Sequence, residues 1–314
     1  MTFGLALLCL ILVAFIIALI AWYLLPRRFK TGKTVANAYD GWTQDQLLER
    51  LWGEHIHLGY YGNPAQYRDF RQAKADFVIA LAYWGGLDKL PLGSRVLDVG
   101  CGIGGSSRLL ASHFGFEVVG VSISAAQVER AKQLTPANLN CSFAIMDALD
   151  LQFVDGEFDA VWTVECAPHI ADKQNFANEL MRMLKPGGVL VAADWNQRDS
   201  TIKPFSPIEE WILEQLRAQW AHPAFSSITS FSDNLIATGC LDHPPRLGNW
   251  SQETLPSWLA SISEGVKRPK AIFSLGPIAL IKAAREIPTL LLMHWAFSSG
   301  LMQFGLFKAE RCRL

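Results

Sequence analysis

The segment VLDVGCGIGG (residues 96–105) places an acid and a glycine-rich loop directly after a run of apolar residues. Asp98 stands two positions before the first glycine, and Gly100, Gly102 and Gly104 follow at alternate positions. Glycine has no Cβ and adopts positive φ angles, so this spacing lets a ligand come close to the backbone and to the next helix N-terminus. The pattern predicts a nucleotide-like ligand at the end of a buried strand.

The loop alone leaves two ligand classes open. Gly100, Gly102 and Gly105 also match the G-x-G-x-x-G spacing of dinucleotide-binding loops. Dinucleotide sites carry Asp or Glu after the next strand, where this chain has Gly-Val-Ser-Ile-Ser at residues 120–124. Asp98 favours S-adenosylmethionine instead, because the methionine part of that cofactor carries a cationic amino group that a carboxylate can hold.

Other polar side chains follow the next predicted strands. Ser122 and Gln127 are placed to hydrogen-bond a ribose, although Gln127 could equally be a polar residue on a helix surface. Asp147 is placed to accept from an adenine amino group with the Ala148 N–H nearby, the alternative being a solvent-facing loop acid. The predicted cofactor-binding residues are Asp98, Gly100, Gly102, Gly104, Ser122, Gln127, Asp147 and Ala148.

The elements that position these residues alternate between strands and helices. The predicted strands are continuous apolar runs, as expected for a parallel sheet covered by helices on both faces. The chain is therefore predicted to be a doubly wound α/β protein that binds ligands at the carboxyl ends of its strands. We predict strands over 95–99, 117–121, 141–145, 158–164 and 189–194. Helices are predicted over 106–114, 125–134 and 175–184, and a further helix over 66–84 that stops at glycine. A turn is predicted at Lys185-Pro186-Gly187-Gly188.

Composition excludes several functions. The formal net charge is −1 and only 18% of residues are charged, so the chain lacks the basic patch typical of nucleic-acid binding. The six cysteines are scattered and form no C-x-x-C pair, which indicates a reducing compartment with neither structural zinc nor disulfides.

The amino-terminal segment is strongly apolar. Residues 3–25 contain no charge, and as a helix they would span about 34 Å, enough to cross a hydrocarbon core of about 30 Å. Trp22 lies at one end, and Arg27 and Arg28 follow, which places the remaining chain on the cytoplasmic side. A cleaved secretory signal is disfavoured because no basic residue precedes the stretch and no small-x-small site follows it. We therefore predict a single-pass membrane anchor that contacts membrane lipid.

The carboxyl-terminal third extends beyond a minimal fold. We predict a helix over 229–238, an edge segment over 240–250 and a closing strand over 301–308. Residues 251–300 are apolar but interrupted by Lys270, Lys282 and Arg285, so they do not form a second span. This pattern favours an amphipathic helical cap over a long apolar substrate, the alternative being a helical face packed on the sheet. The predicted division is an anchor (1–30), a helical and aromatic lid (31–92), a cofactor-binding core (93–250), a helical substrate cap (251–300) and a closing strand with tail (301–314).

Several of these segments carry a family resemblance. The order and spacing of LDVGCGIGG, FDAVWTVECAPHI and LKPGG resemble class I S-adenosylmethionine-dependent methyltransferases. WGEHIHLGYYG, CGIGGSSRLLA and SISAAQVERA resemble the tocopherol and plastoquinol C-methyltransferases of oxygenic phototrophs and, more distantly, sterol side-chain methyltransferases and cyclopropane synthases. The resemblance implies a Rossmann-like fold with a seven-stranded, mostly parallel sheet. In this branch a serine such as Ser122 is usual in place of the ribose acid.

The resemblance implies C-methylation of a prenylated benzoquinol in tocopherol and plastoquinone biosynthesis. The implied acceptors are 2-methyl-6-phytyl-1,4-benzoquinol and 2-methyl-6-solanesyl-1,4-benzoquinol. Two alternatives remain open: a γ-tocopherol or other lipid methyltransferase of the sterol or cyclopropane type, and a non-catalytic cofactor-binding membrane protein.

Such a reaction moves a methyl group from a sulfonium to a ring carbon beside a phenolic hydroxyl. Removing the hydroxyl proton enriches that carbon in electrons, so a general base should contribute. Glu165 and His169 follow the predicted strand 158–164 and are the leading candidates. His169 could instead be a hydrogen-bonded loop residue, and Glu165 could only order the backbone.

The aromatic segment before the core supplies a third catalytic candidate, His57. In the resembled family this segment folds over the active site, and Tyr60 or Tyr61 could stabilise a sulfonium through cation–π attraction. An equal alternative is a lid that excludes water without touching reactants. His55 and His57 lack a further ligand at suitable spacing, so we predict no metal.

Overall fold

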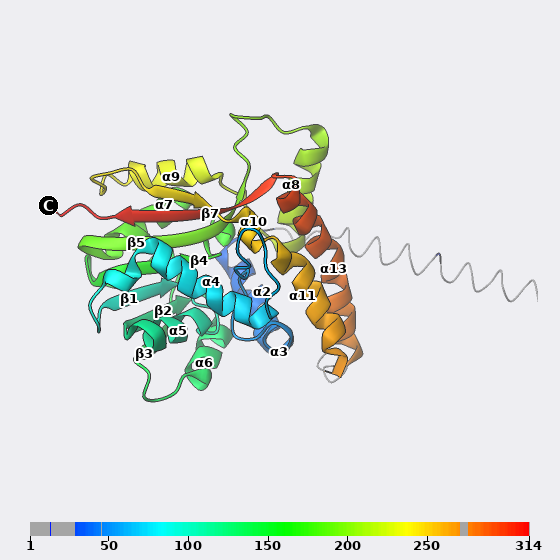
Figure 1. The fold of residues 1–314 in the computed structure, drawn as a ribbon, viewed down its shortest axis with the longest axis horizontal. Coiled ribbons are helices and arrows are strands. Elements are labelled where there is room, and N and C mark those ends of the chain that lie inside the picture. The colour runs from blue at the N-terminus through cyan, green and yellow to red at the C-terminus, as the bar shows by residue number, and fades with distance from the viewer. Residues whose placement is uncertain (1–12, 14–28, 45, 271–275, 314) are drawn as a thin grey trace, which may run out of the picture.

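The computed structural model describes residues 13, 29–44, 46–270 and 276–313. Its fold is built on one twisted sheet (Figure 1). In this part of the chain the seven-stranded sheet has the order β3-β2-β1-β4-β5-β7-β6. Strands β1 to β5 run parallel, and β7 is antiparallel to both β5 and β6. The strands are β1 Arg95–Val99, β2 Glu117–Ser122, β3 Cys141–Ile145, β4 Phe158–Val164, β5 Leu184–Gln197, β6 Arg246–Asn249 and β7 Met302–Glu310.

Both faces of the sheet are buried, which explains the continuous apolar strands. Neighbouring residues of a strand point to opposite faces, so Val96 packs in one buried cluster and Leu97 in another. The first cluster contains Phe77 of α4 (Phe70–Gly85) and the second Phe176 of α7 (Lys173–Met183). Helices α5 (Gly105–Phe114), α6 (Ala125–Leu134) and α9 (Ile228–Ala237) complete the layers. The predicted seven-stranded α/β sheet is therefore present.

Local capping sets the bounds of α4. The Asp69 side chain accepts hydrogen bonds from the Arg71 and Gln72 amides, which begins the helix at Phe70. Gly86 adopts φ 82° and ends it. The predicted glycine stop is confirmed, while the start lies four residues later than the predicted residue 66, where no cap precedes the apolar face.

Two helices precede this region. α2 spans Gly32–Gln44 and α3 spans Leu47–Trp52. α2 is held by polar contacts with α6: Asp40 Oδ1 accepts from Ser124 Oγ at 2.5 Å and from the Ala126 amide at 3.1 Å. Val35 is the one residue of α2 classed as buried, so an apolar period was too weak to predict the helix.

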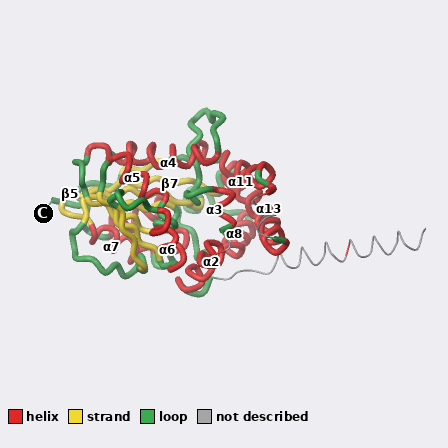
Figure 2. Tube along the Cα trace, turned by 90° about the horizontal axis from the view of Figure 1, so that it is seen from below, coloured by secondary structure: helices red, strands yellow, loops and turns green. Residues whose placement is uncertain are grey.

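A group of helices lies beyond the carboxyl ends of the parallel strands. α8 (Pro207–Trp220), α11 (Pro256–Lys267) and α13 (Pro277–Ser298) stand together on the right in Figure 1, and Figure 2 shows the same grouping from below. With the short α10 (Ser251–Thr254), α11 and α13 separate β6 from β7 in the chain. This insertion occupies the range predicted as a cap.

The predicted transmembrane anchor is corrected. Within the described ranges no helix is both long and apolar enough to cross a membrane. The longest described helix, α13 with 22 residues, contains Lys282, Arg285 and Glu286, charges that a bilayer interior disfavours. The predicted span over residues 3–25 lies, apart from Val13, outside the described residues. Single-pass anchoring, lipid contact through that helix and the resulting placement on the cytoplasmic side are therefore unsupported.

The turn predicted at residues 185–188 is also corrected, because these residues belong to β5. The Gly187 amide donates to Arg311 O, and the Arg311 amide donates to Gly188 O, each at 2.9 Å. Gly187 adopts φ 77°, which allows the bend within the strand. Pairing with the carboxyl-terminal segment, which local sequence cannot reveal, extends the strand through the glycines.

Candidate active site

A first cavity of about 370 Å³ lies at the carboxyl ends of β1, β2 and β4. The loop after β1 lines it, and Gly100 and Gly102 there adopt φ 82° and 55°. Gly104 belongs to the same loop but is not among the residues that line the cavity. With φ 79°, a Cβ on Gly104 would lie 2.7 Å from Phe143 Cζ, so the loop requires glycine at that position.

Asp98 is the buried acid of this cavity. Its side chain is 2% exposed, and its Oδ2 accepts from Ser107 Oγ at 2.6 Å. Burial raises the pKa of Asp98 to about 7, against the lowering effect of the Ser107 hydroxyl. No ion pair is recorded for this carboxyl among the described residues, so a cationic group such as the amino group of S-adenosylmethionine fits the site.

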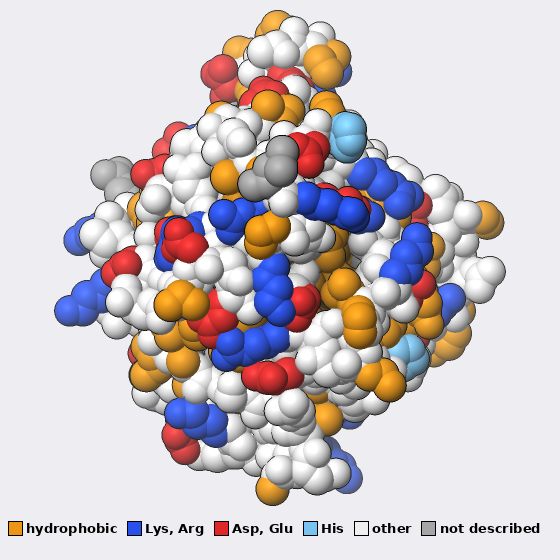
Figure 3. Space-filling model, turned by 90° about the vertical axis from the view of Figure 1, so that its left-hand side faces the viewer, with side chains coloured by type: hydrophobic (Ala, Val, Ile, Leu, Met, Phe, Trp, Pro, Cys, Tyr) orange, Lys and Arg blue, Asp and Glu red, His pale blue; other side chains and the backbone are white. Residues whose placement is uncertain are grey.

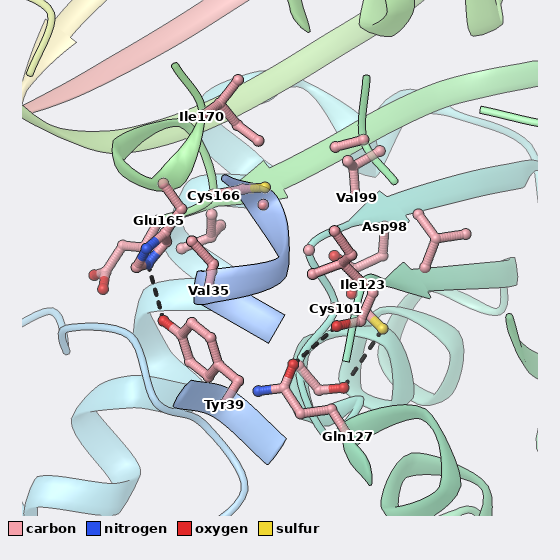
Figure 4. A pocket seen from close by; sticks show the side chains of 18 of the residues that line it. Val35, Tyr39, Asp98, Val99, Cys101, Ile123, Gln127, Glu165, Cys166 and Ile170 are labelled. Atoms are coloured by element: carbon pink, nitrogen blue, oxygen red, sulfur yellow. Dashed lines mark hydrogen bonds between the residues drawn. The ribbon is translucent and has the colours of Figure 1, made fainter. Parts of the chain in front are cut away.

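The other predicted cofactor residues lie around the same space. Ser122 and Gln127 are both buried and line the cavity, with Ser122 Oγ donating to Gln127 Oε1 at 2.9 Å. Asp147 and Ala148 line it from the loop after β3, where Asp147 Oδ1 accepts from the Leu149 amide. Figure 4 shows Asp98 and Gln127 on the opposite side of this space from Tyr39 of α2. Every predicted cofactor residue except Gly104 therefore lines one cavity.

A second cavity of about 380 Å³ lies under α3, α11 and α13. Its lining is mainly apolar and includes Trp42, Trp52, Trp195, Trp220 and Trp258. The residues that line both cavities are Tyr39, Ile56, His57, Glu165 and His169. The cavity that holds the predicted cofactor residues and a more apolar one therefore meet at the three predicted catalytic residues.

Glu165 stands at this junction in an unusual backbone conformation. Its φ of 55° is rare for a residue with a side chain, and its amide donates to Ala193 O at 2.8 Å. Glu165 Oε1 accepts from the Leu58 amide at 2.8 Å. Burial raises the pKa of Glu165 to about 7, against the lowering effects of the Leu58 amide and the Lys74 ammonium. A carboxyl with this pKa is suited to general base catalysis near neutral pH.

His169 lies beside Glu165 and is held by aromatic neighbours. Its Nε2 is 2.9 Å from the Tyr39 hydroxyl, and its ring centroid is 4.4 Å from that of His222. Burial lowers the pKa of His169 to about 3, so the ring is neutral and weakly basic. Of the two leading candidates, Glu165 is the stronger base, and His169 is suited to orienting a hydroxyl.

His57 lines both cavities, but its two ring nitrogens are engaged with the chain. Nδ1 donates to Leu58 O at 2.8 Å, and Nε2 lies 3.1 Å from His55 Nδ1. Burial lowers the pKa of His57 to about 3. His57 therefore orders the segment whose Leu58 amide binds Glu165. Among the described residues no group of three or more His, Cys, Asp or Glu side chains is arranged to hold a metal.

The two tyrosines of that segment lie away from the junction. Neither Tyr60 nor Tyr61 is among the lining residues of the two cavities. Tyr60 packs against Trp250 in a tilted arrangement with ring centroids 4.8 Å apart, and the Tyr61 amide donates to Glu253 O at 2.8 Å. Their contacts correspond to packing of the lid rather than to contact with a sulfonium.

Three polar residues of the site were not predicted: Tyr39, Lys74 and His222. Lys74 is buried, donates to His55 O at 2.7 Å and lies 4.2 Å from the Phe70 ring centroid. Burial lowers the pKa of Lys74 to about 7. A lysine on the apolar face of the predicted helix was an available signal for this residue. Tyr39 and His222 had none, because only the folded chain brings them to His169.

Comparison with known proteins defines the class of this chain. Residues 97–192 match the family described as a methyltransferase domain. The cyclopropane synthase MmaA2 from Mycobacterium tuberculosis has the same fold, with a TM-score of 0.72, 16% identity, and coverage of 88% of this chain and 97% of that one. The [4+2]-cyclase SpnF shares the fold too, with a TM-score of 0.71, 21% identity, and coverage of 91% and 98%. The chain belongs to the S-adenosylmethionine-dependent methyltransferases.

Relatives of higher identity narrow the group. The 2-methyl-6-phytyl-1,4-hydroquinone methyltransferase of Synechocystis sp. is 53% identical over 290 residues, which cover 92% of this chain and 91% of that protein. The chloroplastic tocopherol O-methyltransferase of Arabidopsis thaliana is 33% identical over 279 residues, covering 84% and 78%. The predicted resemblance to the tocopherol and plastoquinol methyltransferases, the enzyme class and the cofactor are confirmed.

Proposed function

We propose that this methyltransferase methylates a ring carbon of a prenylated 1,4-benzoquinol, either 2-methyl-6-phytyl- or 2-methyl-6-solanesyl-1,4-benzoquinol. The observation that carries the proposal is the meeting of two cavities at Tyr39, Glu165 and His169. One cavity offers a buried acid to a cationic cofactor, and the other offers apolar walls to a prenyl tail. The name of the Synechocystis relative states a phytylated hydroquinone as its substrate.

The residues of the first cavity suit the parts of S-adenosylmethionine, which supplies a methyl group on a positively charged sulfur when bound. In this assignment the Asp98 carboxylate holds the amino group, and Ser122 and Gln127 hydrogen-bond the ribose. Asp147 accepts from the adenine amino group, and the Ala148 N–H lies beside it. Residues 93–250 thus form the cofactor-binding core, and residues 31–92 the lid.

Glu165, His169 and His57, which line both cavities, support the proton transfer in this proposal. In a 2-methyl-6-prenyl-1,4-benzoquinol both carbons beside the 1-hydroxyl are substituted. The two free ring carbons are therefore the two that flank the 4-hydroxyl. Glu165 takes the 4-hydroxyl proton, which makes the neighbouring ring carbon nucleophilic. The ring carbon would bond the methyl group as the bond between that methyl and the cofactor sulfur breaks, with S-adenosylhomocysteine as the leaving group. The hydrogen on the ring carbon would then leave as a proton to solvent, and Glu165 would return its proton to the 4-oxygen, which restores the aromatic quinol. Neutral His169, held by Tyr39, orients the hydroxyl, and His57 keeps the Leu58 amide on Glu165.

The helices of residues 251–300 suit the prenyl tail. Trp258 and Ile262 of α11 and Ile287 and Leu290 of α13 line the second cavity. Burying a long hydrocarbon there contributes about 25 cal/mol for each Å² removed from water. This range therefore acts as the substrate cap.

A second acceptor class is a tocopherol, favoured by the similarity to the Arabidopsis enzyme. The test is an assay of purified full-length protein with methyl-labelled S-adenosylmethionine and each acceptor: the phytyl quinol, the solanesyl quinol and γ-tocopherol. We expect a labelled ring-methyl product from a quinol, identified by mass spectrometry. Methylation of γ-tocopherol with neither quinol turned over would overturn the proposal in favour of the second class.

A further inference from the structure

His222 is a buried side chain that the proposed reaction does not use. It follows α8 and is 4% exposed. It lines the second cavity and is not among the residues of the first. Its ring centroid lies 4.4 Å from His169, 5.4 Å from Phe225 and 5.7 Å from Trp195, so neighbouring rings on several sides hold it in place.

One hydrogen bond defines the tautomer of His222. Its Nδ1 lies 3.1 Å from Pro168 O, and a carbonyl oxygen can only accept, so Nδ1 carries the proton. Burial lowers the pKa of His222 well below its usual value. The ring is therefore neutral, and Nε2 is unprotonated. His222 presents an acceptor and no second donor.

That acceptor has no partner within the described part of the chain. His222 Nε2 is buried and makes no hydrogen bond there. A buried acceptor without a partner costs free energy, so such groups are usually paired. An acceptor in this state suits a hydrogen-bond donor on a ligand of the second cavity.

We propose that His222 determines acceptor specificity by accepting a hydrogen bond from the 1-hydroxyl of the quinol, the one between the methyl group and the prenyl tail. This inference rests on the proposed function. Glu165 lies where the two cavities meet, whereas His222 lines the second cavity alone, and the His169 ring lies against His222. The two hydroxyls lie at opposite ends of a benzoquinol ring. A ring with its 4-hydroxyl at Glu165 therefore directs its 1-hydroxyl into the second cavity.

The fixed tautomer makes the chemical distinction sharp. A free 1-hydroxyl donates to Nε2, whereas an ether oxygen at the same position has no hydrogen and faces Nε2 with lone pairs. A chromanol, in which the tail is closed onto that oxygen, has such an ether, and so does the 1-O-methyl ether of the quinol. Sites built to hydrogen-bond a hydroxyl reject analogues that lack it. We expect wild-type protein to prefer the free quinol over its 1-O-methyl ether by about 10- to 100-fold in kcat/KM.

The test compares this preference in wild-type protein and two variants, with both acceptors present as 2-methyl-6-phytyl compounds. His222→Phe keeps a ring of similar size and removes the acceptor, and the preference should fall to about 3-fold or less. His222→Gln offers an amide oxygen that can accept and an amide N–H that can donate to an ether. It should recover quinol turnover and still show a weakened preference. His113→Phe, at an exposed histidine of α5, is the matched control and should keep the wild-type preference.

The ratio of kcat/KM for the quinol to kcat/KM for its 1-O-methyl ether distinguishes a specificity role of His222 from a structural one. A purely structural role would lower kcat/KM for both acceptors equally. Calorimetry with S-adenosylhomocysteine verifies that each variant retains its first cavity. A wild-type protein that methylates the quinol and its 1-O-methyl ether equally well overturns the inference without any variant. An undiminished preference in His222→Phe overturns it too. A wild-type protein inactive on every prenylated quinol overturns the proposed function, and this inference with it.

Discussion

At the scale of single residues, two buried carboxyl groups divide the work of the site. Burial raises the pKa of both Asp98 and Glu165 to about 7. Asp98 accepts a hydrogen bond from the Ser107 hydroxyl, whereas Glu165 is held by the Leu58 amide and lies at the junction of the two cavities. Asp98 therefore suits the cationic amino group of the cofactor, and Glu165 suits a proton that is taken up and released during the reaction.

Asp98→Asn should weaken binding of S-adenosylmethionine about 10- to 100-fold, because a neutral amide replaces a carboxylate beside the cationic amino group. Titration calorimetry measures this affinity. Asp88→Asn, at an exposed aspartate, is the matched control and should bind normally. Equal affinity in Asp98→Asn and wild type would remove Asp98 from the cofactor site.

The same substitution should change the pH dependence of stability. The folded-state pKa of Asp98 lies above its unfolded value of 3.8, so its neutral form contributes stability that is fully present below about pH 4 and is lost as pH rises through about 7. The cofactor-free wild type should lose up to about 4 kcal/mol across this window from Asp98 alone. Asp98→Asn should lack this loss in denaturant unfolding at pH 5 and pH 8. An identical pH dependence in the two proteins would contradict the buried acid.

Glu165→Gln should lower kcat about 100-fold or more and leave cofactor affinity within about 3-fold, because an amide cannot take the hydroxyl proton. In wild type, kcat/KM should rise with pH through about 7 as Glu165 loses its proton. His169→Ala should keep this rise at a lower rate, since the pKa of His169 is about 3. A pH profile that Glu165→Gln shares with wild type would assign the base elsewhere.

At the scale of elements, α2 joins two sides of the first cavity. Consecutive residues of this helix point to different partners: Tyr39 bonds His169 after β4, and Asp40 bonds Ser124 and the Ala126 amide at the start of α6. Asp40 thus supplies from another helix a capping acceptor for α6. Because Val35 and Tyr39 also line the cavity, the position of α2 and the shape of the cofactor site depend on each other.

Asp40→Ala should lower cofactor affinity about 3- to 30-fold, because loss of a capping acceptor costs about 0.5–2 kcal/mol and loosens α2 over the cavity. Hydrogen exchange of the α6 amides should become faster. Asp69→Ala is a sharp control, since Asp69 caps α4 away from the first cavity. It should destabilise the fold to a similar degree and keep the affinity. A loss of affinity that is equal in both variants would mean that general destabilisation, and not α2, is responsible.

At the scale of the whole molecule, the sheet and the helical group meet along one seam. Figures 1 and 2 show the strands at one end and α8, α11 and α13 at the other, with α2 and α3 between them. The first cavity belongs to the sheet and the second to the helices. On the face drawn in Figure 3, acidic and basic side chains are interspersed, in keeping with a net charge of −1. In the function proposed above, the prenyl tail of the acceptor is buried among the apolar residues of the second cavity.

Ile262→Trp should select against long tails, because a larger side chain would fill part of a cavity of about 380 Å³. The variant should lose about 10-fold in kcat/KM for a phytylated quinol and keep the rate on a short-tailed prenyl quinol. Leu259→Trp on the same helix is the control, because Leu259 is 46% exposed and does not line the cavity. Equal losses on both tails in Ile262→Trp would place the tail elsewhere.

The sequence by itself determined the parts that depend on local spacing. The glycine loop, Asp98 and the alternation of strands and helices predicted the sheet and the cofactor, because each follows from the backbone needs of neighbouring residues. Glu165 and His169 were predicted because they directly follow a strand whose end faces the ligand. The membrane anchor was predicted from a long apolar run with aromatic and basic residues at its end, and no described helix supports it.

Only the tertiary structure decided which residues share the junction and in what state. Tyr39 shares the junction with Glu165 and His169, whereas Lys74 and His222 line the second cavity beside it, and these residues come from elements far apart in the chain. Burial then changes the acid–base behaviour of the site. It raises the pKa of Glu165 to about 7 and lowers the pKa values of His169 and His222. Such shifts arise from removing water around a charge, which is a property of the packed fold and not of any segment of the sequence.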